Sequence, residues 1–320
     1  MDIIAVVGPT ATGKSDLALD IAEHLGGTSA AEIINADAYQ LYTGMDIGTA
    51  KVAEEDRRGI THHQLDVLDV HDDSSVAAYQ THARKDIAAV HSRHKRPILV
   101  GGSGLYVRAV LDEMTFPGTD AAVRETLEEQ AETLGTHALY QRLLHADPAA
   151  AHAIGSRNTR RIVRALEVIE LTGKPYSANL PRQEYVQPTI TLGLDYDREA
   201  LDQRIEQRVD IMLESGLVEE VRGLVDYGMG RTAARAVGYA EIIEYLQGNC
   251  TLDEAKTQII TNTRRLTRKQ MGWFGRDPRI QWLDAQAPHL VEQALDIVHK
   301  HDQGLITHNT EHPVRRSLGS

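Results

Sequence analysis

The spacing of hydrophobic residues changes at residue 8. Residues 2–7 read Asp-Ile-Ile-Ala-Val-Val, an apolar run with the length of a buried strand. Leu17, Ile21 and Leu25 follow at intervals of four, which places them on one face of a helix. Residues 8–15 are therefore predicted to connect a strand to a helix.

This connection reads Gly-Pro-Thr-Ala-Thr-Gly-Lys-Ser and matches the pattern G-x-x-x-x-G-K-[ST], which is informative only between a strand and a helix. Glycines let the backbone wrap an anion, so that loop and helix N–H groups point towards it. The lysine adds a positive charge, and the last hydroxyl suits Mg²⁺. The motif does not specify which phosphate is bound. The expected phosphate-binding residues are Gly8, Pro9, Thr10, Ala11, Thr12, Gly13, Lys14 and Ser15, with Ser15 at the metal.

Further patterns predict the remaining elements of an α/β sheet. Helical spacing covers residues 76–91 and 201–212, and apolar runs predict strands at 32–37, 62–70, 97–106 and 188–195. In open α/β sheets, ligands bind beyond the carboxyl ends of the strands. Asp37 lies at such an end and is a candidate catalytic carboxylate, with a turn cap as the alternative.

Two features limit the possible chemistry. The strand at 97–106 breaks into glycines, where a nucleotide-hydrolysing P-loop protein would carry an acidic residue that holds magnesium. This absence disfavours a motor or a switch. His62 and His63 are neighbours in a predicted strand and point to opposite faces, so we interpret them as structural.

The alternation of strands stops in the middle of the chain. From about residue 114 to 187, helix-forming segments are separated by Gly and Pro. We therefore predict a core in two parts, residues 1–113 and 188–300, with a helical insertion at 114–187. Residues 301–320 lack periodicity and are predicted to form a mobile tail.

Arginine and lysine concentrate in two ranges. Residues 157–164 contain four arginines and no acidic residue, which suits phosphate binding or a solvated helix face. Residues 256–279 carry seven basic residues against one acidic residue, interleaved with Trp273 and Phe274. A protein that binds the backbone of a nucleic acid and stacks on its bases requires such a mixture of basic and aromatic residues. The alternative is a helix that packs its tryptophan on the core.

Arg204 and Arg208 lie one helical turn apart beside the apolar stripe of residues 201–212. They could reach the anion site or pair with Glu206 or Asp210.

Composition fits a soluble globular protein, with 42% hydrophobic and 25% charged residues among 320. The net charge of −12 argues against uniform nonspecific nucleic-acid binding but permits a basic face. One cysteine excludes an internal disulfide framework and a cysteine zinc cluster, and it suits a reducing cytosol. Without a signal peptide or membrane span, we expect a cytoplasmic protein with no membrane partner.

Several stretches together resemble one family, the tRNA dimethylallyltransferases, also called isopentenyl-tRNA transferases. The most specific is Asn35-Ala-Asp-Ala-Tyr-Gln-Leu-Tyr42 with Gly44-Met-Asp-Ile-Gly-Thr-Ala-Lys51. The others follow in family order, at residues 8–15, 100–106, 160–167, 171–175, 236–239 and 267–274. The resemblance implies an α/β, P-loop NTPase-like core with a mainly parallel sheet and a helical insertion domain. It also implies Mg²⁺ and transfer of a dimethylallyl group from its diphosphate to the exocyclic amine of the adenosine 3′ to the anticodon in tRNA.

The resemblance also implies roles for individual residues. Asp37 matches the general base, Ser15 the hydroxyl near Mg²⁺, and Arg208 the arginine that assists the diphosphate together with Lys14. Gly275 stands where relatives often carry arginine, which removes one expected positive charge. The expected contacts with the anticodon arm of tRNA are Asp37, Ala38, Tyr39, Gln40, Ser103, Arg124, Arg160, Arg161, Ile162, Val163, Arg164, Arg268, Lys269, Gln270, Trp273 and Phe274.

Other functions remain open at this point. A prenyltransferase acting on free adenine nucleotide would share the core, but it would need neither the insertion nor the basic C-terminal stretch. A P-loop small-molecule kinase fits the Gly8–Ser15 loop but not residues 35–51. A noncatalytic tRNA-binding module would use the basic faces alone. A monomer is expected.

Overall fold

The computed structural model describes residues 1–179, 183–306 and 316–319. Its contacts divide the chain into a core unit, Met1–Leu111 with Tyr185–Ser320, and an insertion unit, Asp112–Glu184. The sequence patterns placed the insertion at 114–187. Among the described helices, none is both long and apolar enough to cross a membrane.

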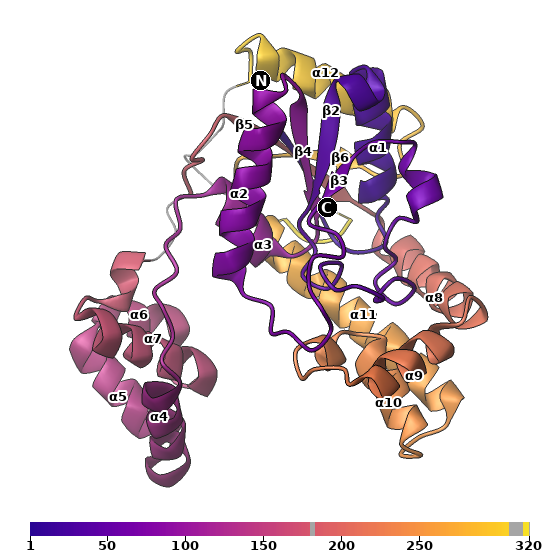
Figure 1. The fold of residues 1–320 in the computed structure, drawn as a ribbon. Coiled ribbons are helices and arrows are strands. Elements are labelled where there is room, and N and C mark those ends of the chain that lie inside the picture. The colour runs from indigo at the N-terminus through magenta and orange to yellow at the C-terminus, as the bar shows by residue number, and fades with distance from the viewer. Residues whose placement is uncertain (180–182, 307–315, 320) are drawn as a thin grey trace. The chain divides into compact units, whose positions relative to one another are not determined.

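The core unit is built on a six-stranded sheet (Figure 1), in which every paired strand is parallel to its neighbour. The carboxyl ends of β1, β2, β4 and β5 therefore meet at one edge. This confirms the predicted α/β fold with a mainly parallel sheet. In spatial order the strands are β3 (His62–His63), β2 (Ala31–Asn35), β4 (Arg96–Gly101), β1 (Ile3–Val7), β5 (Thr189–Asp195) and β6 (Ile280–Asp284).

Alternate residues of β1 enter two different hydrophobic layers. Ile4 and Val6 pack towards α1 (Lys14–His24) and α12 (Leu290–Asp302). Ile3, Ala5 and Val7 pack towards α2 (Val76–Ser92) and α3 (Gly104–Leu111). Helices thus cover both faces of the sheet (Figure 1), and all five residues of β1 are buried.

Four helices form a third apolar cluster in the core unit. They are α8 (Arg198–Glu214), α9 (Leu217–Tyr227), α10 (Tyr239–Leu246) and α11 (Leu252–Phe274). Tyr42 and Met45, from the segment after β2, are fully buried in the same cluster. The motif at 35–51 therefore packs against helices that lie more than 150 residues later in the chain. Short 3-10 helices are η1 (Gly27–Ser29), η2 (Glu54–Arg57) and η4 (Ala233–Arg235).

The insertion unit is a small helical bundle with its own core. Its helices are α4 (Ala121–Leu134), α5 (Thr136–Ala146), α6 (Pro148–Ile154) and α7 (Thr159–Thr172), followed by η3 (Tyr176–Asn179). Asp120, Asp147 and Asn158 cap the first turns of α4, α6 and α7. Leu127, Leu143 and other apolar side chains fill the space between the helices. The sequence patterns placed helices in this range.

Two predicted elements differ from the structure. The strand expected at 62–70 is reduced to His62–His63, because Gln64 and Asp66 have positive φ angles of 60° and 54°. The tail was expected from residue 301, but α12 continues to Asp302. Further on, the Arg316 N–H donates to the Gly275 carbonyl at 2.9 Å. Residues 307–315 and 320 of that expected tail lie outside the described residues.

Candidate active site

The Gly8–Ser15 loop leaves β1 close to β5 and enters α1. Gly8 has a φ of 142°, and a Cβ there would lie 2.7 Å from the Leu194 carbonyl oxygen, so only glycine fits. Gly13, with a φ of 87°, turns the chain into α1. Ala11 has a φ of 65°, which is uncommon for a residue with a side chain. The close approach to β5 thus fixes a loop that wraps around a central space.

The first turn of α1 supplies donors to that space. The first N–H groups of a helix have no partner within it. Within residues 1–179, 183–306 and 316–319, no hydrogen bond engages the N–H of Lys14, Ser15 or Asp16. These groups and the positive end of the helix dipole favour an anion.

Lys14 lines this space and is partly buried. Burial lowers the pKa of its ammonium group from 10.5 to about 7, opposed by Asp37 and reinforced by Arg208. Its Nζ donates to the Pro9 carbonyl at 2.5 Å. A bound anion would favour the charged form, so this lysine is expected to gain a proton when a phosphate enters.

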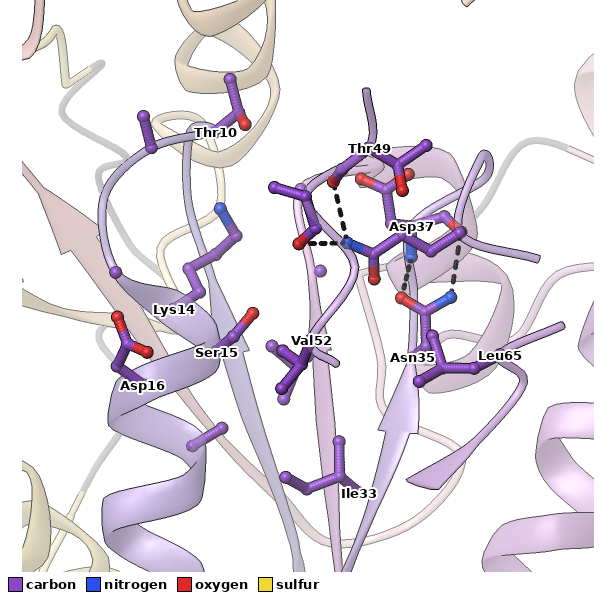
Figure 2. Close-up of a pocket in the computed structure, with 18 of the residues that line it drawn as sticks. Thr10, Lys14, Ser15, Asp16, Ile33, Asn35, Asp37, Thr49, Val52 and Leu65 are labelled. Atoms are coloured by element: carbon purple, nitrogen blue, oxygen red, sulfur yellow. Dashed lines mark hydrogen bonds between the residues drawn. The ribbon is translucent and has the colours of Figure 1, made fainter. Parts of the chain in front are cut away.

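Asp37 faces Lys14 and Ser15 across the same cavity (Figure 2). The side chain of Asn35, at the end of β2, accepts from the Asp37 N–H at 2.9 Å and donates to the Asp37 carbonyl at 3.1 Å. One carboxylate oxygen of Asp37 accepts from the Tyr39 N–H at 3.0 Å. In the part of the chain that the structure describes, the other oxygen has no hydrogen-bond partner and is available to a substrate.

The glycines at the end of β4 pack against neighbouring backbone. A Cβ on Gly101 would lie 2.3 Å from the Ala36 carbonyl oxygen. Gln270 of α11 donates to the Gly102 carbonyl at 3.0 Å and accepts from the Thr10 N–H at 2.9 Å. An acidic side chain of the nucleotide-hydrolase type has no room at this strand end, and Gln270 instead ties α11 to the Gly8–Ser15 loop.

Two adjoining cavities meet at Asp37. The polar cavity has a volume of about 240 Å³ and lies over Lys14 and Ser15. The apolar cavity has a volume of about 180 Å³ and lies between residues 37–49 and the helices α8 and α11. Both include Thr10, Thr49 and Arg208 in their walls, and the apolar one adds Ile205, Val209, Met212, Val237, Ile259 and Leu266.

Arg208 lines both cavities, and the acidic residues beside it on α8 pair with other groups. Glu206 pairs with Arg264, and Asp210 pairs with Lys256. No ion pair of Arg208 occurs among the described residues. Burial lowers the pKa of Arg208, and the positive charge of Arg204 lowers it further. Of the two alternatives that the sequence left open, the structure therefore supports an orientation towards the anion site.

The expected tRNA contacts in the insertion unit fall into three groups. Ile162 and Val163 are 0% and 3% exposed, so the expectation that they touch tRNA is corrected: they face the core of the bundle. Arg124 and Arg164 both pair with buried Glu167, at 2.9 and 2.8 Å. The expected contacts Arg160 and Arg161 are exposed, and so is Arg157 nearby in the chain.

The expected contacts on α11 also divide by helix face. Phe274 is buried against the sheet layer of α2 and α3, which corrects its assignment to the tRNA surface. Gln270 lines the two cavities rather than the outer surface. Trp273 is 41% exposed, and Arg268 and Lys269 are exposed beside it. Arg264, Lys256 and Arg268 pair with carboxylates of α8, which reduces the positive charge counted from sequence.

The remaining expected contacts lie near Asp37. The Ser103 hydroxyl accepts from the Ala38 N–H at 3.2 Å, so it holds the Asp37 segment in place. Gln40 donates to the carbonyls of Thr49 and Ala50, at 3.1 and 3.4 Å. Tyr39 lies at the wall of the apolar cavity, where burial raises its pKa.

The walls of the apolar cavity were not predicted from the sequence. Val209 and Met212 occur at helical spacing, and this pattern is the same for residues that line a cavity and for residues that fill a core. Val237 lies in the stretch that carried the family resemblance, which was the only signal for it in the sequence.

Fold and site together define a P-loop-like α/β protein in which the anion loop faces a carboxylate and an apolar cavity. This arrangement differs from a nucleotide hydrolase, because glycines occupy the strand end where an acidic residue would hold magnesium. The family model described as IPP transferase matches residues 40–277. The chain belongs to this family, as the motifs predicted.

Relatives cover nearly the whole chain. A tRNA dimethylallyltransferase of Bifidobacterium animalis subsp. lactis is 53% identical over 94% of this chain and 88% of its own length. One from Streptomyces avermitilis is 54% identical over 91% and 92%. The full-length tRNA isopentenylpyrophosphate transferase of Bacillus halodurans is 37% identical, with a TM-score of 0.69 over 94% and 97% of the two chains. A eukaryotic dimethylallyltransferase acting on tRNA shares the fold, at 24% identity and a TM-score of 0.80 over 97% and 81%.

Proposed function

We propose that this protein is a tRNA dimethylallyltransferase that moves the dimethylallyl group of dimethylallyl diphosphate to the exocyclic amine of an adenosine in tRNA. The observation that carries the proposal is the junction of a polar anion cavity and an apolar cavity at Asp37. A diphosphate fits the first, a five-carbon hydrocarbon chain fits the second, and the carboxylate lies where the two meet.

In the proposed reaction, the bond between the allyl carbon and the diphosphate oxygen breaks, and a bond from that carbon to the adenine nitrogen forms. The N–H groups of the first turn of α1, Lys14 and Arg208 would stabilise the negative charge that grows on the leaving pyrophosphate. Asp37 would accept the proton lost by the amine. Because the amine lone pair is delocalised into the ring, such a base is expected to contribute about 10²–10⁴ in rate.

Mg²⁺ fits the polar cavity, although no cluster of three or more His, Cys, Asp or Glu side chains suited to a metal occurs in the described part of the chain. Magnesium usually keeps several waters and binds through one or two protein groups together with substrate phosphates. The Ser15 hydroxyl, at the start of α1, lines the cavity together with the carboxylates of Asp16 and Asp37. When bound, the ion would neutralise charge on the diphosphate.

The adenosine would leave its base stack to enter the site, at a cost of a few kcal/mol. Exposed basic groups on each unit would bind the tRNA. On the insertion unit these groups are Arg157, Arg160 and Arg161, and on α11 they are Arg268 and Lys269 beside Trp273. Their number and exposure suit contacts with the phosphates of an anticodon arm. Within the same proposal the enzyme is a monomer, since one chain carries every group named above. The proposal also places it in the cytoplasm.

The test is to incubate the protein with Mg²⁺, labelled dimethylallyl diphosphate and undermodified tRNA. Label in the adenosine 3′ to the anticodon is the expected result. In a parallel reaction with free adenine nucleotides, label in the nucleotide would indicate a nucleotide prenyltransferase instead. In a reaction with labelled nucleoside triphosphate and small acceptors, label in the acceptor would indicate a kinase. A protein that binds tRNA but transfers no label would overturn the proposal in favour of a binding module.

A further inference from the structure

Glu220 of α9 accepts hydrogen bonds from the loop at residues 46–48, which lies far away in sequence. Its Oε2 accepts from the N–H groups of Asp46 and Ile47, at 3.1 and 2.7 Å. Its Oε1 accepts from the Gly48 N–H at 3.2 Å and from the Tyr239 hydroxyl at 2.5 Å. A carboxylate offers about four acceptor positions, and here this chain fills them all. We call this arrangement the Glu220 clasp.

Tyr239 forms the second part of the clasp. It is fully buried, and burial followed by the charge of Glu220 raises its pKa far above 10, so the hydroxyl remains a donor. Its ring lies against Gly48, where a Cβ would come within 2.4 Å of a ring carbon. Glycine at this position in the family motif is therefore explained by contact with a ring from α10.

The loop that the clasp holds forms a wall of the site. Thr49, the next residue after Gly48, lines both the polar and the apolar cavity. The carbonyl of Thr49 also accepts from Gln40, three residues after Asp37. A chain of direct contacts therefore runs from Glu220 through residues 46–50 to the segment of the catalytic carboxylate.

We propose that Glu220, together with Tyr239, is a positioning residue for dimethylallyl transfer. It holds residues 46–50 at the junction of the two cavities and so sets the space in which the allyl carbon meets the amine. This inference rests on the proposed function. Glu220 lines neither cavity. It therefore acts through the loop.

Two variants test the clasp at different strengths. Glu220→Gln keeps the size of the side chain but brings an amide N–H₂ towards groups that are all donors. Tyr239→Phe removes one hydroxyl and leaves the ring against Gly48, so it remains informative if the first variant loses stability. The matched control is Glu219→Gln, because the neighbouring carboxylate of Glu219 is 70% exposed.

Steady-state transfer to tRNA and binding of inorganic pyrophosphate are measured for each folded variant. A displacement of about 1 Å in a positioning element can lower the rate about 10²-fold. We expect kcat/KM for dimethylallyl diphosphate to fall about 100-fold in Glu220→Gln and about 10-fold in Tyr239→Phe. Pyrophosphate affinity should stay within about twofold of wild type, because among the described residues no hydrogen bond joins the Gly8–Ser15 loop to Glu220 or Tyr239.

The kinetic split separates positioning from general loss of structure. Wild-type kinetics in both clasp variants, or a parallel loss of pyrophosphate binding, would overturn the assignment of Glu220. A wild-type protein that transfers no label to tRNA while binding pyrophosphate would instead overturn the proposed function. Unchanged kinetics in Glu219→Gln are required for the comparison to support the clasp.

Discussion

The low pKa of Lys14 predicts that the protein takes up a proton when it binds a diphosphate. Burial holds this pKa at about 7 in the free protein, whereas an anion against the ammonium group restores the charged form. At pH 8, a group with this pKa is about 90% deprotonated, so binding should draw in about 0.9 proton. A lysine of ordinary pKa would already be charged and would take up almost none.

The same reasoning gives a pH dependence of affinity. The charged form is the competent one, and its fraction in the free protein falls about 50-fold between pH 7 and pH 9. If the pKa in the complex is well above 9, affinity for dimethylallyl diphosphate should fall by the same factor over this range. The sign is fixed, because a lowered pKa in the free state makes binding weaker as pH rises.

The assay is titration calorimetry with dimethylallyl diphosphate and Mg²⁺ at pH 8, in two buffers that differ in ionisation enthalpy. The difference in heat between buffers gives the proton uptake. Lys14→Arg is the control, since its guanidinium stays charged, and proton changes on the ligand are common to both proteins. If wild type and Lys14→Arg take up equal numbers of protons, the assigned pKa of Lys14 is wrong.

Three further predictions follow from the site and the core. Asp37→Asn should bind tRNA normally but lose about 10²–10⁴ in single-turnover transfer rate, and near-normal turnover would remove Asp37 as the base. Replacing Arg160 and Arg161 with alanine should weaken tRNA binding and reduce its salt dependence, measured by filter binding from low to high salt; an unchanged slope would show that these arginines do not meet phosphate. Gly101→Ala brings a Cβ within 2.3 Å of a backbone carbonyl and should destabilise the protein by about 1–3 kcal/mol in urea denaturation. Gly118→Ala, with no neighbour within 4 Å, is its control, and equal effects of both changes would refute the packing argument.

The strand-to-helix connection at residues 8–15 could be predicted from sequence because its signals are local. An apolar run, two glycines and a helical repeat are each defined by neighbours in the chain. The same holds for the insertion, whose helices begin at local caps such as Asp120 and Asn158. Family motifs then indicated which substrate this loop serves, which the loop alone left open.

Orientation and partnership depended on tertiary structure. Trp273 and Phe274 are neighbours in sequence, yet one is exposed and the other is buried, because the helix phase relative to the sheet decides their environment. Arg208 and Arg264 look alike in sequence, but only Arg264 meets the carboxylate of Glu206. Local patterns contain no information about which groups of other elements lie within bonding distance.

The clearest case is the segment at residues 35–51. Sequence indicated its importance through Asp37 and through the match to the family, but not what holds it in place. Its loop is held by Glu220, which lies 172 to 174 residues later, and by the ring of Tyr239. Sequence by itself determined the phosphate-type loop and the candidate base. Only folding decided how they face each other, because contacts between distant segments form when helices and sheet pack together.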